Sequence, residues 1–248
     1  RLAGSRPHID NAHPSRFWCA VMYVLYIANK NYSSWSLRPW VLMRELRIEF
    51  KEELRPFNPG SNWTAFRTFS PSGKVPCLVD GEHVVWDSLS IVEYLAERHP
   101  SVWPQDAGVR AWARSAAAEM HSGFGALRER CSMSCGIRVR LNDTPAALTR
   151  DIERMDELWT QGLDRFGGPF LTGQAFTAVD AFFAPIAFRA QTYGLKFKPG
   201  AAQYLARPLR LPSLQAWYTA ALAEPWREED HEDEVRKTGT IVEDLRTS

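Results

Sequence analysis

The chain has 248 residues, of which 45% are hydrophobic and 24% charged, so its composition is that of a globular protein with one large domain or two smaller ones. Its formal net charge of +1 excludes the strongly basic surface that binds nucleic acid or an anionic membrane. No apolar run approaches the roughly 18 residues that span a bilayer. We therefore expect neither a nucleic acid nor a membrane as a partner.

The first part of the chain, residues 1–21, is rich in Pro, His, Arg, Asn and Ser and shows no periodicity. It also lacks the apolar core of a secretory signal. We predict that residues 1–21 form a disordered extension, with a natural start at Met22.

The chain contains four cysteines, and two of them, Cys131 and Cys135, are separated by three residues. This spacing differs from the Cys-x-x-Cys redox signature, and a second ligand pair at zinc-like spacing is missing. The cysteines are therefore interpreted as buried spectator thiols, and no metal site is expected. Such cysteine usage favours a reducing cytoplasm.

Strands alternate with helices in the sequence pattern of residues 22–99. Strands are predicted at residues 23–28, 48–54, 77–79 and 83–86, helices at 37–46 and 89–97, and a loop with a short helix at 58–69. Ser36 is expected to cap the first helix. The second strand is expected to lie parallel to the first, because a right-handed crossover joins them. The order β-α-β-α-β-β-α is typical of a thioredoxin-like domain.

A linker at residues 100–108 is followed by a pattern that is helical only. Helices are predicted at residues 109–129, 146–166, 180–193 and 214–223, within an all-helical domain at 109–227. Thr177 and Asp180 form a capping box at the start of the third of these helices. The acidic run that begins at Glu228 indicates a polar, solvated tail over residues 228–248.

A small binding site is predicted around residues 75–88. A cis peptide bond at Pro76 would turn the backbone of Val75 toward a ligand. After the hairpin, Ser88 at a helix N-cap would offer a hydroxyl and free N–H groups to an anion, and Asp87 could hold a cation. Together these groups suit the head group of an amino acid.

These residues, with the serine pair at 33–34, resemble the N-terminal half of a bacterial-type glutathione transferase, and the likeness extends over residues 23–224. The resemblance implies an α/β thioredoxin-like N-terminal domain followed by an all-α C-terminal domain, with glutathione as co-substrate. It implies that Val75 and Pro76 pair with the cysteinyl part of glutathione. It also implies that Asp87 and Ser88 hold the γ-glutamyl end. Lys74 would pair with a glutathione carboxylate.

An enzyme that uses glutathione must lower the pKa of its thiol, which is near 8.5 when free, because the thiolate is the nucleophile. Hydrogen-bond donors and positive potential aimed at the sulfur achieve this. The turn between the first strand and the first helix, residues 32–38, is the expected place, because the helix N-terminus adds its dipole there.

The turn resembles the zeta-class motif Ser-Ser-Cys-x-x-Arg. This likeness implies that Ser33 is the catalytic hydroxyl, Ser34 a supporting donor and Arg38 the helix arginine. Trp35 stands where the zeta cysteine would be, which weakens the case for the zeta reaction, maleylacetoacetate isomerisation. Tyr32 is an alternative thiol donor, because other classes use a tyrosine.

The electrophile is expected to bind between this turn and the first helix of the second half. Residues 119–128 combine apolar, aromatic and cationic side chains, and an arginine there would suit an acidic substrate. The predicted substrate site consists of Tyr32, Trp35, Met120, His121, Phe124 and Arg128.

The expected function is a glutathione transferase that activates the thiol for attack on a small electrophilic, mostly apolar substrate. One alternative is a glutathione-dependent cis-trans isomerase of the maleylacetoacetate type. Another is a non-catalytic binding or regulatory protein, because a fold does not fix a function. The resemblance further implies a cytoplasmic homodimer that acts in detoxification.

Overall fold

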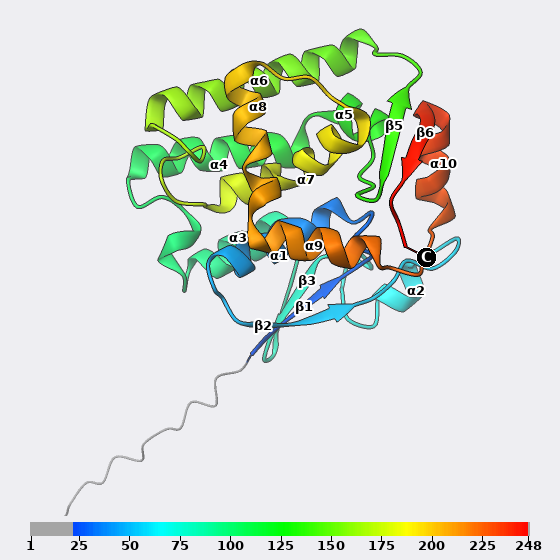
Figure 1. The fold of residues 1–248 in the computed structure, drawn as a ribbon. Coiled ribbons are helices and arrows are strands. Elements are labelled where there is room, and N and C mark those ends of the chain that lie inside the picture. Colours follow the sequence, from blue (N-terminus) through cyan, green and yellow to red (C-terminus); the bar gives the residue numbers. More distant parts are fainter. Residues whose placement is uncertain (1–21, 248) are drawn as a thin grey trace, which may run out of the picture.

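The computed structural model describes residues 22–247. The N-terminal half contains a four-stranded sheet in the order β2-β1-β3-β4 (Figure 1). The strands are β1 (Tyr23–Ile27), β2 (Phe50–Leu54), β3 (Cys77–Asp80) and β4 (His83–Trp86). β1 pairs with β2 in parallel, and the other two pairings are antiparallel.

Three helices complete this half: α1 (Ser34–Glu45), α2 (Trp63–Phe66) and α3 (Ser88–Ala96). The predicted thioredoxin-like element order is therefore confirmed. α1 begins at Ser34 and has Ser33 at its N-cap, so the expectation of a cap at Ser36 is wrong. Ser36 lies inside the first turn, fully buried, and its Oγ accepts a hydrogen bond from the Ala28 N–H at 3.3 Å.

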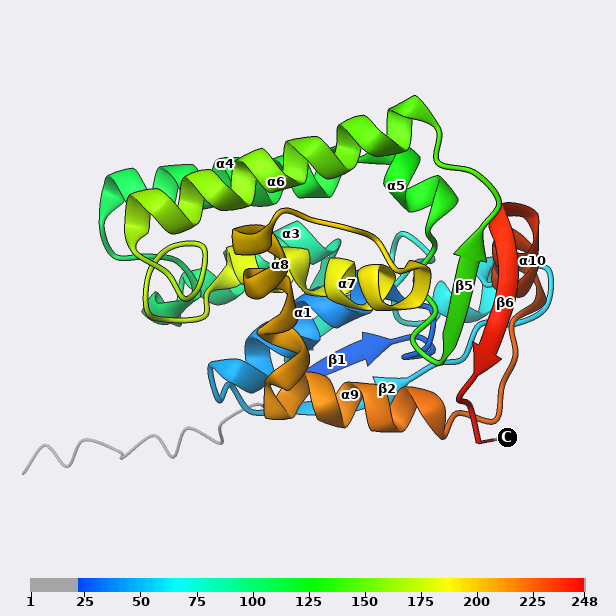
Figure 2. The same cartoon turned by 45° about the horizontal axis from the view of Figure 1, so that its top comes forward.

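The second half is mainly helical. Its elements are η1 (Pro100–Val102), α4 (Ala107–Ser122), α5 (Gly125–Arg130), α6 (Ala146–Phe166), α7 (Ala178–Tyr193), α8 (Pro199–Ala206), η2 (Pro208–Arg210) and α9 (Pro212–Leu222). In Figure 2, α7 runs between α1 on one side and the long helices α4 and α6 on the other. The capping box that starts α7 is present, with Thr177 N donating to Asp180 Oδ2 at 3.0 Å.

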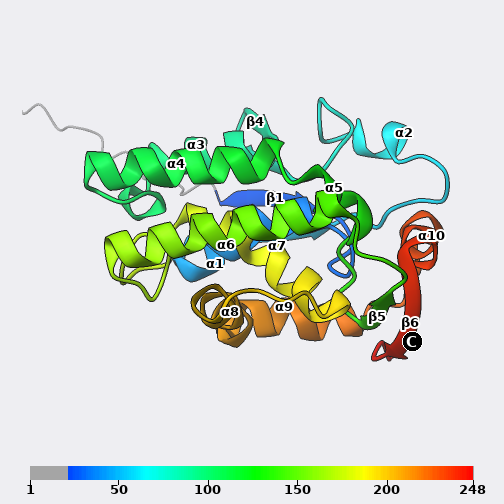
Figure 3. The same cartoon turned by 90° about the horizontal axis from the view of Figure 1, so that it is seen from above.

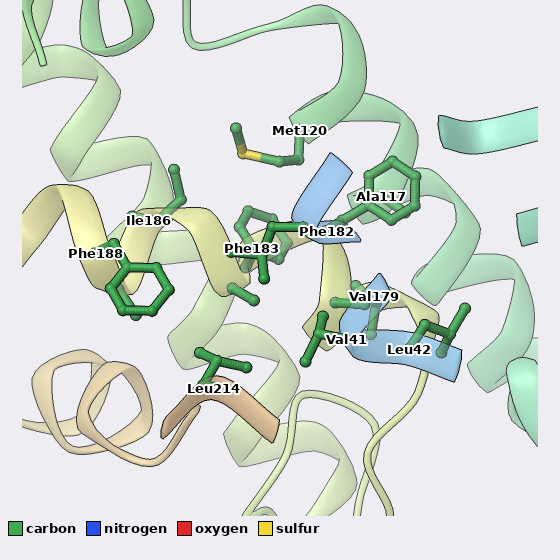
Figure 4. Packing of buried hydrophobic residues seen from close by; sticks show 14 of the residues in the cluster. Val41, Leu42, Ala117, Met120, Val179, Phe182, Phe183, Ile186, Phe188 and Leu214 are labelled. Carbon is green, nitrogen blue, oxygen red and sulfur yellow. The ribbon is translucent and has the colours of Figure 1, made fainter. Parts of the chain in front are cut away.

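One hydrophobic core joins the two halves. In Figure 4, Val41 and Leu42 of α1 lie beside Val179 and Phe182 of α7, with Met120 of α4 on the far side. Each of these side chains is at most 2% exposed. The predicted linker belongs to this core as well, because Val102 and Trp103 are buried. The first helix of the second half is therefore held at a fixed distance from the β1–α1 turn.

The predicted helix at residues 109–129 is two helices, α4 and α5. Gly123 and Phe124 separate them, and Phe124 adopts a left-handed backbone with φ of 56°. A Cβ at Gly123 would lie 2.8 Å from the Glu119 carbonyl oxygen, so only glycine fits this close approach. The strand β5 (Ile137–Leu141) after α5 was not expected from the sequence.

The expectation of a solvated tail at residues 228–248 is wrong. The segment forms α10 (Glu229–Thr238) and β6 (Gly239–Asp244), and β6 pairs antiparallel with β5 (Figure 3). The acidic run is partly buried because distant residues neutralise it. Glu232, 5% exposed, accepts hydrogen bonds from Tyr32 and Arg246. The helical half thus carries a two-stranded ribbon in addition to its helices.

The prediction for residues 1–21 lies outside the described residues. Among residues 22–247, every helix is too short or too polar to cross a membrane.

Candidate functional site

A cavity of about 450 Å³ lies where the two halves meet. Tyr32, Ser33, Ser34 and Trp35 of the β1–α1 turn form one wall. The remaining walls come from the loop around α2, from residues 73–75, from α5 and the two residues Ser132 and Met133, from Arg189 of α7 and from α10. A groove of about 460 Å³ adjoins the cavity, because both are lined by Trp35, Lys74 and Val75.

Ser33 is positioned by the start of α1. Its N–H donates to the Asn29 carbonyl at 2.8 Å, and its side chain donates to Ser36 Oγ at 2.7 Å. The residue is 5% exposed, and its hydroxyl lies at the helix N-terminus, where the helix dipole is positive. A hydroxyl can rotate its hydrogen from one acceptor to another. Ser33 could therefore exchange its bond to Ser36 for one to an anionic ligand in the cavity.

Ser34 has a different neighbour. Its Oγ accepts a hydrogen bond from Arg189 Nη2 at 3.2 Å, so its own hydrogen is not used in that bond. Arg189 is buried, donates to the Cys131 carbonyl, and its pKa is lowered to about 10 by burial. The guanidinium places positive potential directly behind the Ser34 hydroxyl. The two serines therefore offer two hydroxyl donors at one helix N-terminus.

The hydroxyl of Tyr32 is engaged elsewhere. It donates to Glu232 Oε1 at 2.6 Å and accepts from Arg246 Nη1 at 3.2 Å. Burial, followed by the hydrogen bond to Glu232, raises the pKa of Tyr32 well above its ordinary value. The ring lines the cavity, and its hydrogen is directed to α10.

The groove contains the residues that were expected to bind glutathione. Lys74, Val75, Pro76, Asp87 and Ser88 line it, and the Val75–Pro76 peptide bond is cis, as expected. Asp87 is the N-cap of α3, with its carboxylate accepting from the Leu89 N–H at 2.8 Å. Ser88 is the first helical residue, so the expectation that it is the N-cap is wrong.

Arg38 connects the groove with the second half. Its side chain is buried and donates to Ser88 Oγ at 3.4 Å, and its Cζ lies 4.1 Å from the centre of the Trp35 ring. Burial, together with the nearby Arg128 and Arg189, lowers the pKa of Arg38 to about 9. Three arginines therefore surround this part of the site and give it a positive potential.

The substrate residues expected on the second half divide into two groups. Arg128 lines the cavity. His121 lines neither the cavity nor the groove, but its Nε2 lies 3.5 Å from Oδ2 of Asp87, a groove residue. Met120 and Phe124 are buried in the core and do not line the cavity, so that expectation is wrong. Met120 is not available to a ligand because it packs in the hydrophobic cluster that also contains Phe182 of α7 (Figure 4).

The cavity also contains residues that the sequence did not single out. They are Phe57, Asn62, Trp63, Phe66, Gly73, Ser132, Met133, Arg189, His231 and Glu234. Arg189 lies inside an apolar helix pattern and His231 inside an acidic run, so neither carries a local signal for a site. Only the packing of α7 and α10 against the β1–α1 turn brings them there.

The cysteines of the described residues are buried free thiols. Burial raises the pKa of Cys77 to about 11 and that of Cys131 to about 12, and it raises the pKa of Cys135 further. These thiols are therefore protonated at neutral pH. Residues 22–247 contain no cluster of His, Cys, Asp and Glu that could hold a metal ion.

A thioredoxin-like domain that carries a serine-bearing turn, followed by a helical domain, defines the class of this fold. Residues 32–98 match the family model of the glutathione S-transferase N-terminal domain, and residues 110–220 match that of the C-terminal domain. The chain belongs to the glutathione S-transferase superfamily.

The sequence identity between this chain and individual relatives is modest. The chain is similar to a probable maleylacetoacetate isomerase of Caenorhabditis elegans, with 25% identity over 191 residues, 71% of this chain and 82% of the relative. It is 30% identical to a zeta-class glutathione S-transferase of Euphorbia esula over 123 residues, 48% of this chain and 55% of the relative. The structure resembles the theta-class glutathione S-transferase of Xanthomonas axonopodis pv. citri with glutathione bound. That similarity has a TM-score of 0.59 and 22% identity, and covers 79% of this chain and 96% of the other, so it establishes the fold alone.

Proposed function

We propose that the protein is a glutathione transferase in which Ser33 and Ser34 stabilise the glutathione thiolate for attack on a small, mostly apolar electrophile. One observation carries the proposal. The two serine hydroxyls lie at the N-terminus of α1 in the wall of a cavity, beside a groove lined by Val75 and Asp87.

The chemistry follows from the charge of the thiolate. Hydroxyl hydrogen bonds and a helix N-terminus both favour the charged form of a nearby acid, and each pKa unit corresponds to about 1.4 kcal/mol. Arg189 and Arg128 add positive charge on the same side of the cavity. Ser33 is the preferred donor to the sulfur, with Ser34 as its support.

In the groove, glutathione would be bound through its γ-glutamyl and cysteinyl parts. The γ-glutamyl group would bind to Asp87 and Ser88, and the cysteinyl backbone to Val75, which Pro76 follows. Lys74 would pair with a carboxylate, because it lines both the groove and the cavity. Glutathione is thus a co-substrate, consumed or regenerated according to the reaction.

The electrophile would occupy the rest of the cavity. Trp35, Phe57, Trp63 and Met133 give it a largely apolar lining, while Arg128 contributes a cation. These walls favour a small apolar molecule with a polar or anionic end. In a conjugation, the thiolate sulfur forms a bond to the electrophilic carbon, and the leaving group departs with the bonding electrons.

A second candidate is a cis-trans isomerase of the maleylacetoacetate type. The similarity to the C. elegans and E. esula proteins favours it. In that reaction the thiolate would add to a double bond, the adduct would rotate, and the thiolate would leave again. Trp35, in the position of the zeta cysteine, counts against a close match.

The test is titration of glutathione into the purified protein by calorimetry, with thiolate absorbance near 240 nm followed against pH. We expect the wild type to bind glutathione and to show thiolate at neutral pH. Ser33→Ala should bind but lose thiolate, and Ser34→Ala should lose part of it. Ser115→Ala is the matched control, because Ser115 is an exposed residue of α4 that donates to the Ala111 carbonyl.

Each result distinguishes the proposed enzyme from a non-catalytic protein, or tests the role of the two serines. Binding with unchanged thiolate in both serine variants would reject their catalytic role. A wild type that does not bind glutathione would reject the enzyme and favour a non-catalytic binding or regulatory protein. The same proposal includes a two-fold homodimer, a cytoplasmic location and a role in detoxification, all supported by the family. The oligomeric state is measurable by light scattering.

A further inference from the structure

The N-terminal half of α10 forms part of the cavity wall. His231 and Glu234 line the same cavity as Ser33 and Ser34. This helix belongs to the segment that follows α9, beyond residues 110–220, where the family model of the C-terminal domain ends. The helix is fixed to the N-terminal half by the hydrogen bond from Tyr32 to Glu232, so the position of His231 is well defined.

The imidazole of His231 is held on three sides. Its ring stacks on Tyr32 with 5.1 Å between ring centres and on Phe57 with 5.3 Å. Its Nδ1 lies 2.5 Å from Glu228 Oε2, and the same oxygen accepts from the His231 N–H at 2.9 Å. Glu228 is 8% exposed, so this carboxylate is shielded from water.

This contact determines which nitrogen carries the hydrogen. A carboxylate only accepts, so the neutral ring has its hydrogen on Nδ1, and Nε2 keeps a lone pair. Within residues 22–247, the described hydrogen bonds and ion pairs of the ring involve Nδ1 only. A histidine oriented by a buried carboxylate in a substrate cavity is the arrangement that transfers protons in many enzymes.

We propose that His231, oriented by Glu228, accepts the thiol proton of bound glutathione through Nε2 and returns it to the product. This inference rests on the proposed function. With an α,β-unsaturated ketone, the S–H proton moves to Nε2 and the thiolate forms a bond to the β-carbon. The electrons of the double bond pass to the carbonyl, giving an enolate. The imidazolium then protonates the α-carbon, so that glutathione and the ketone give one adduct with no other reactant.

Several charged or titratable groups surround His231. Glu228 is the N-cap of α10, and Glu232 and Glu234 lie on this helix. Tyr32 comes from the β1–α1 turn, and Arg246 donates to both Tyr32 and Glu232. The other cavity walls contribute Lys74, Arg128 and Arg189. Phe57 adds no charge. The serines stabilise the thiolate, and His231 takes the proton that the thiolate has lost. The two roles are therefore separable by experiment.

The main variant is His231→Phe, which keeps a flat ring between Tyr32 and Phe57 and removes the proton acceptor. The first measurement mixes glutathione with the protein at pH 7.5 in weakly buffered dye solution. Thiolate is read at 240 nm, and released protons are read from the dye. His83→Phe is the control, because His83 is an exposed residue of β4 away from the cavity.

We expect the wild type and His83→Phe to form thiolate and to release clearly less than one proton for each thiolate. His231→Phe should release about one proton for each thiolate, because the proton then passes to the solvent. Equal release of one proton by wild type and His231→Phe would overturn the inference. A wild type that forms no thiolate would reject the proposed function itself, and the inference with it.

The second measurement is turnover of glutathione with 4-phenyl-3-buten-2-one. His231→Phe should lower kcat by about 100-fold, the lower end of the range for general acid–base catalysis, and change the pH profile of kcat. Glu228→Gln should lower kcat less, since an amide oxygen still orients the ring without the charge. An unchanged kcat and pH profile in His231→Phe would overturn the inference, as would a loss confined to glutathione binding.

Discussion

The hydroxyl of Tyr32 and the carboxylate of Glu232, 200 residues apart in the chain, form a hydrogen bond of 2.6 Å. It joins the turn that precedes α1 to the middle of α10. Arg246 completes the contact by donating to both residues, so a tyrosine, an acid and a base share one partly buried network. This network closes one side of the cavity and places His231 beside the serine turn.

Tyr32→Phe tests the network. We expect a loss of about 1 kcal/mol in the free energy of unfolding, typical of one hydrogen bond, because Glu232 keeps Arg246 as a partner. Thiolate formation with glutathione should persist, since the Tyr32 hydrogen is directed to α10. Urea denaturation and absorbance at 240 nm measure the two effects. Loss of thiolate with full binding would make Tyr32 the thiol donor. Tyr94→Phe, which loses a 2.7 Å bond to Asp80, is the control for stability.

Arg189→Gln should reduce the positive potential behind Ser34. We expect the pKa of the bound glutathione thiol to rise by about one unit, because a cation close to the sulfur favours the thiolate. Arg189→Lys keeps the charge and should retain most of the thiolate. Titration of the absorbance at 240 nm against pH distinguishes the two variants. Equal behaviour of the two variants would show that the charge of Arg189 does not act on the sulfur.

Asp180 should make the stability depend on pH. Burial raises the pKa of this carboxyl from 3.8 to about 6, although its hydrogen bonds to Thr177 and Leu171 oppose the rise. Between about pH 4 and pH 6 the folded protein therefore holds a proton that the unfolded chain has released. The stabilising contribution is complete below pH 4, and the free energy of unfolding falls as the pH rises through 6.

The Asp180→Asn variant isolates this effect. It should lose the pH-dependent component, and it should be less stable by about 1–3 kcal/mol, because an amide cannot accept from both backbone N–H groups. Urea denaturation of both proteins at pH 4, 5, 6 and 7 provides the comparison. The same pH slope in both proteins would contradict the assignment to Asp180.

The buried cysteines should be unreactive in the folded protein. Cys77, Cys131 and Cys135 are buried, and the pKa of each is raised. In a Cys19→Ser variant, Ellman's reagent should react with the native protein at least about 100-fold more slowly than with the unfolded chain. Fast reaction of a native thiol would place one of the three within reach of solvent.

The local pattern of the sequence was sufficient for much of the fold. The hairpin at residues 77–86, the helix at 146–166 and the capping box of Thr177 and Asp180 all follow from short-range rules. Apolar periodicity and turn residues determine such elements, because neighbouring residues supply most of their hydrogen bonds. The break between α4 and α5 was missed because it depends on the close approach of the Gly123 backbone to a carbonyl.

By itself the sequence determined that a thioredoxin-like half precedes a helical half. It also indicated that Ser33, in the turn before the first helix, and Val75, before the hairpin, belong to a binding site. Only the tertiary structure decided the other side of the cavity that they line. Met120 lies in the core, whereas Arg189 of α7 reaches Ser34 and His231 of α10 reaches the same cavity. The reason is physical: a buried charge is stable only where partners from elsewhere in the chain surround it. No local pattern around Glu232 records that Tyr32 and Arg246 will be those partners.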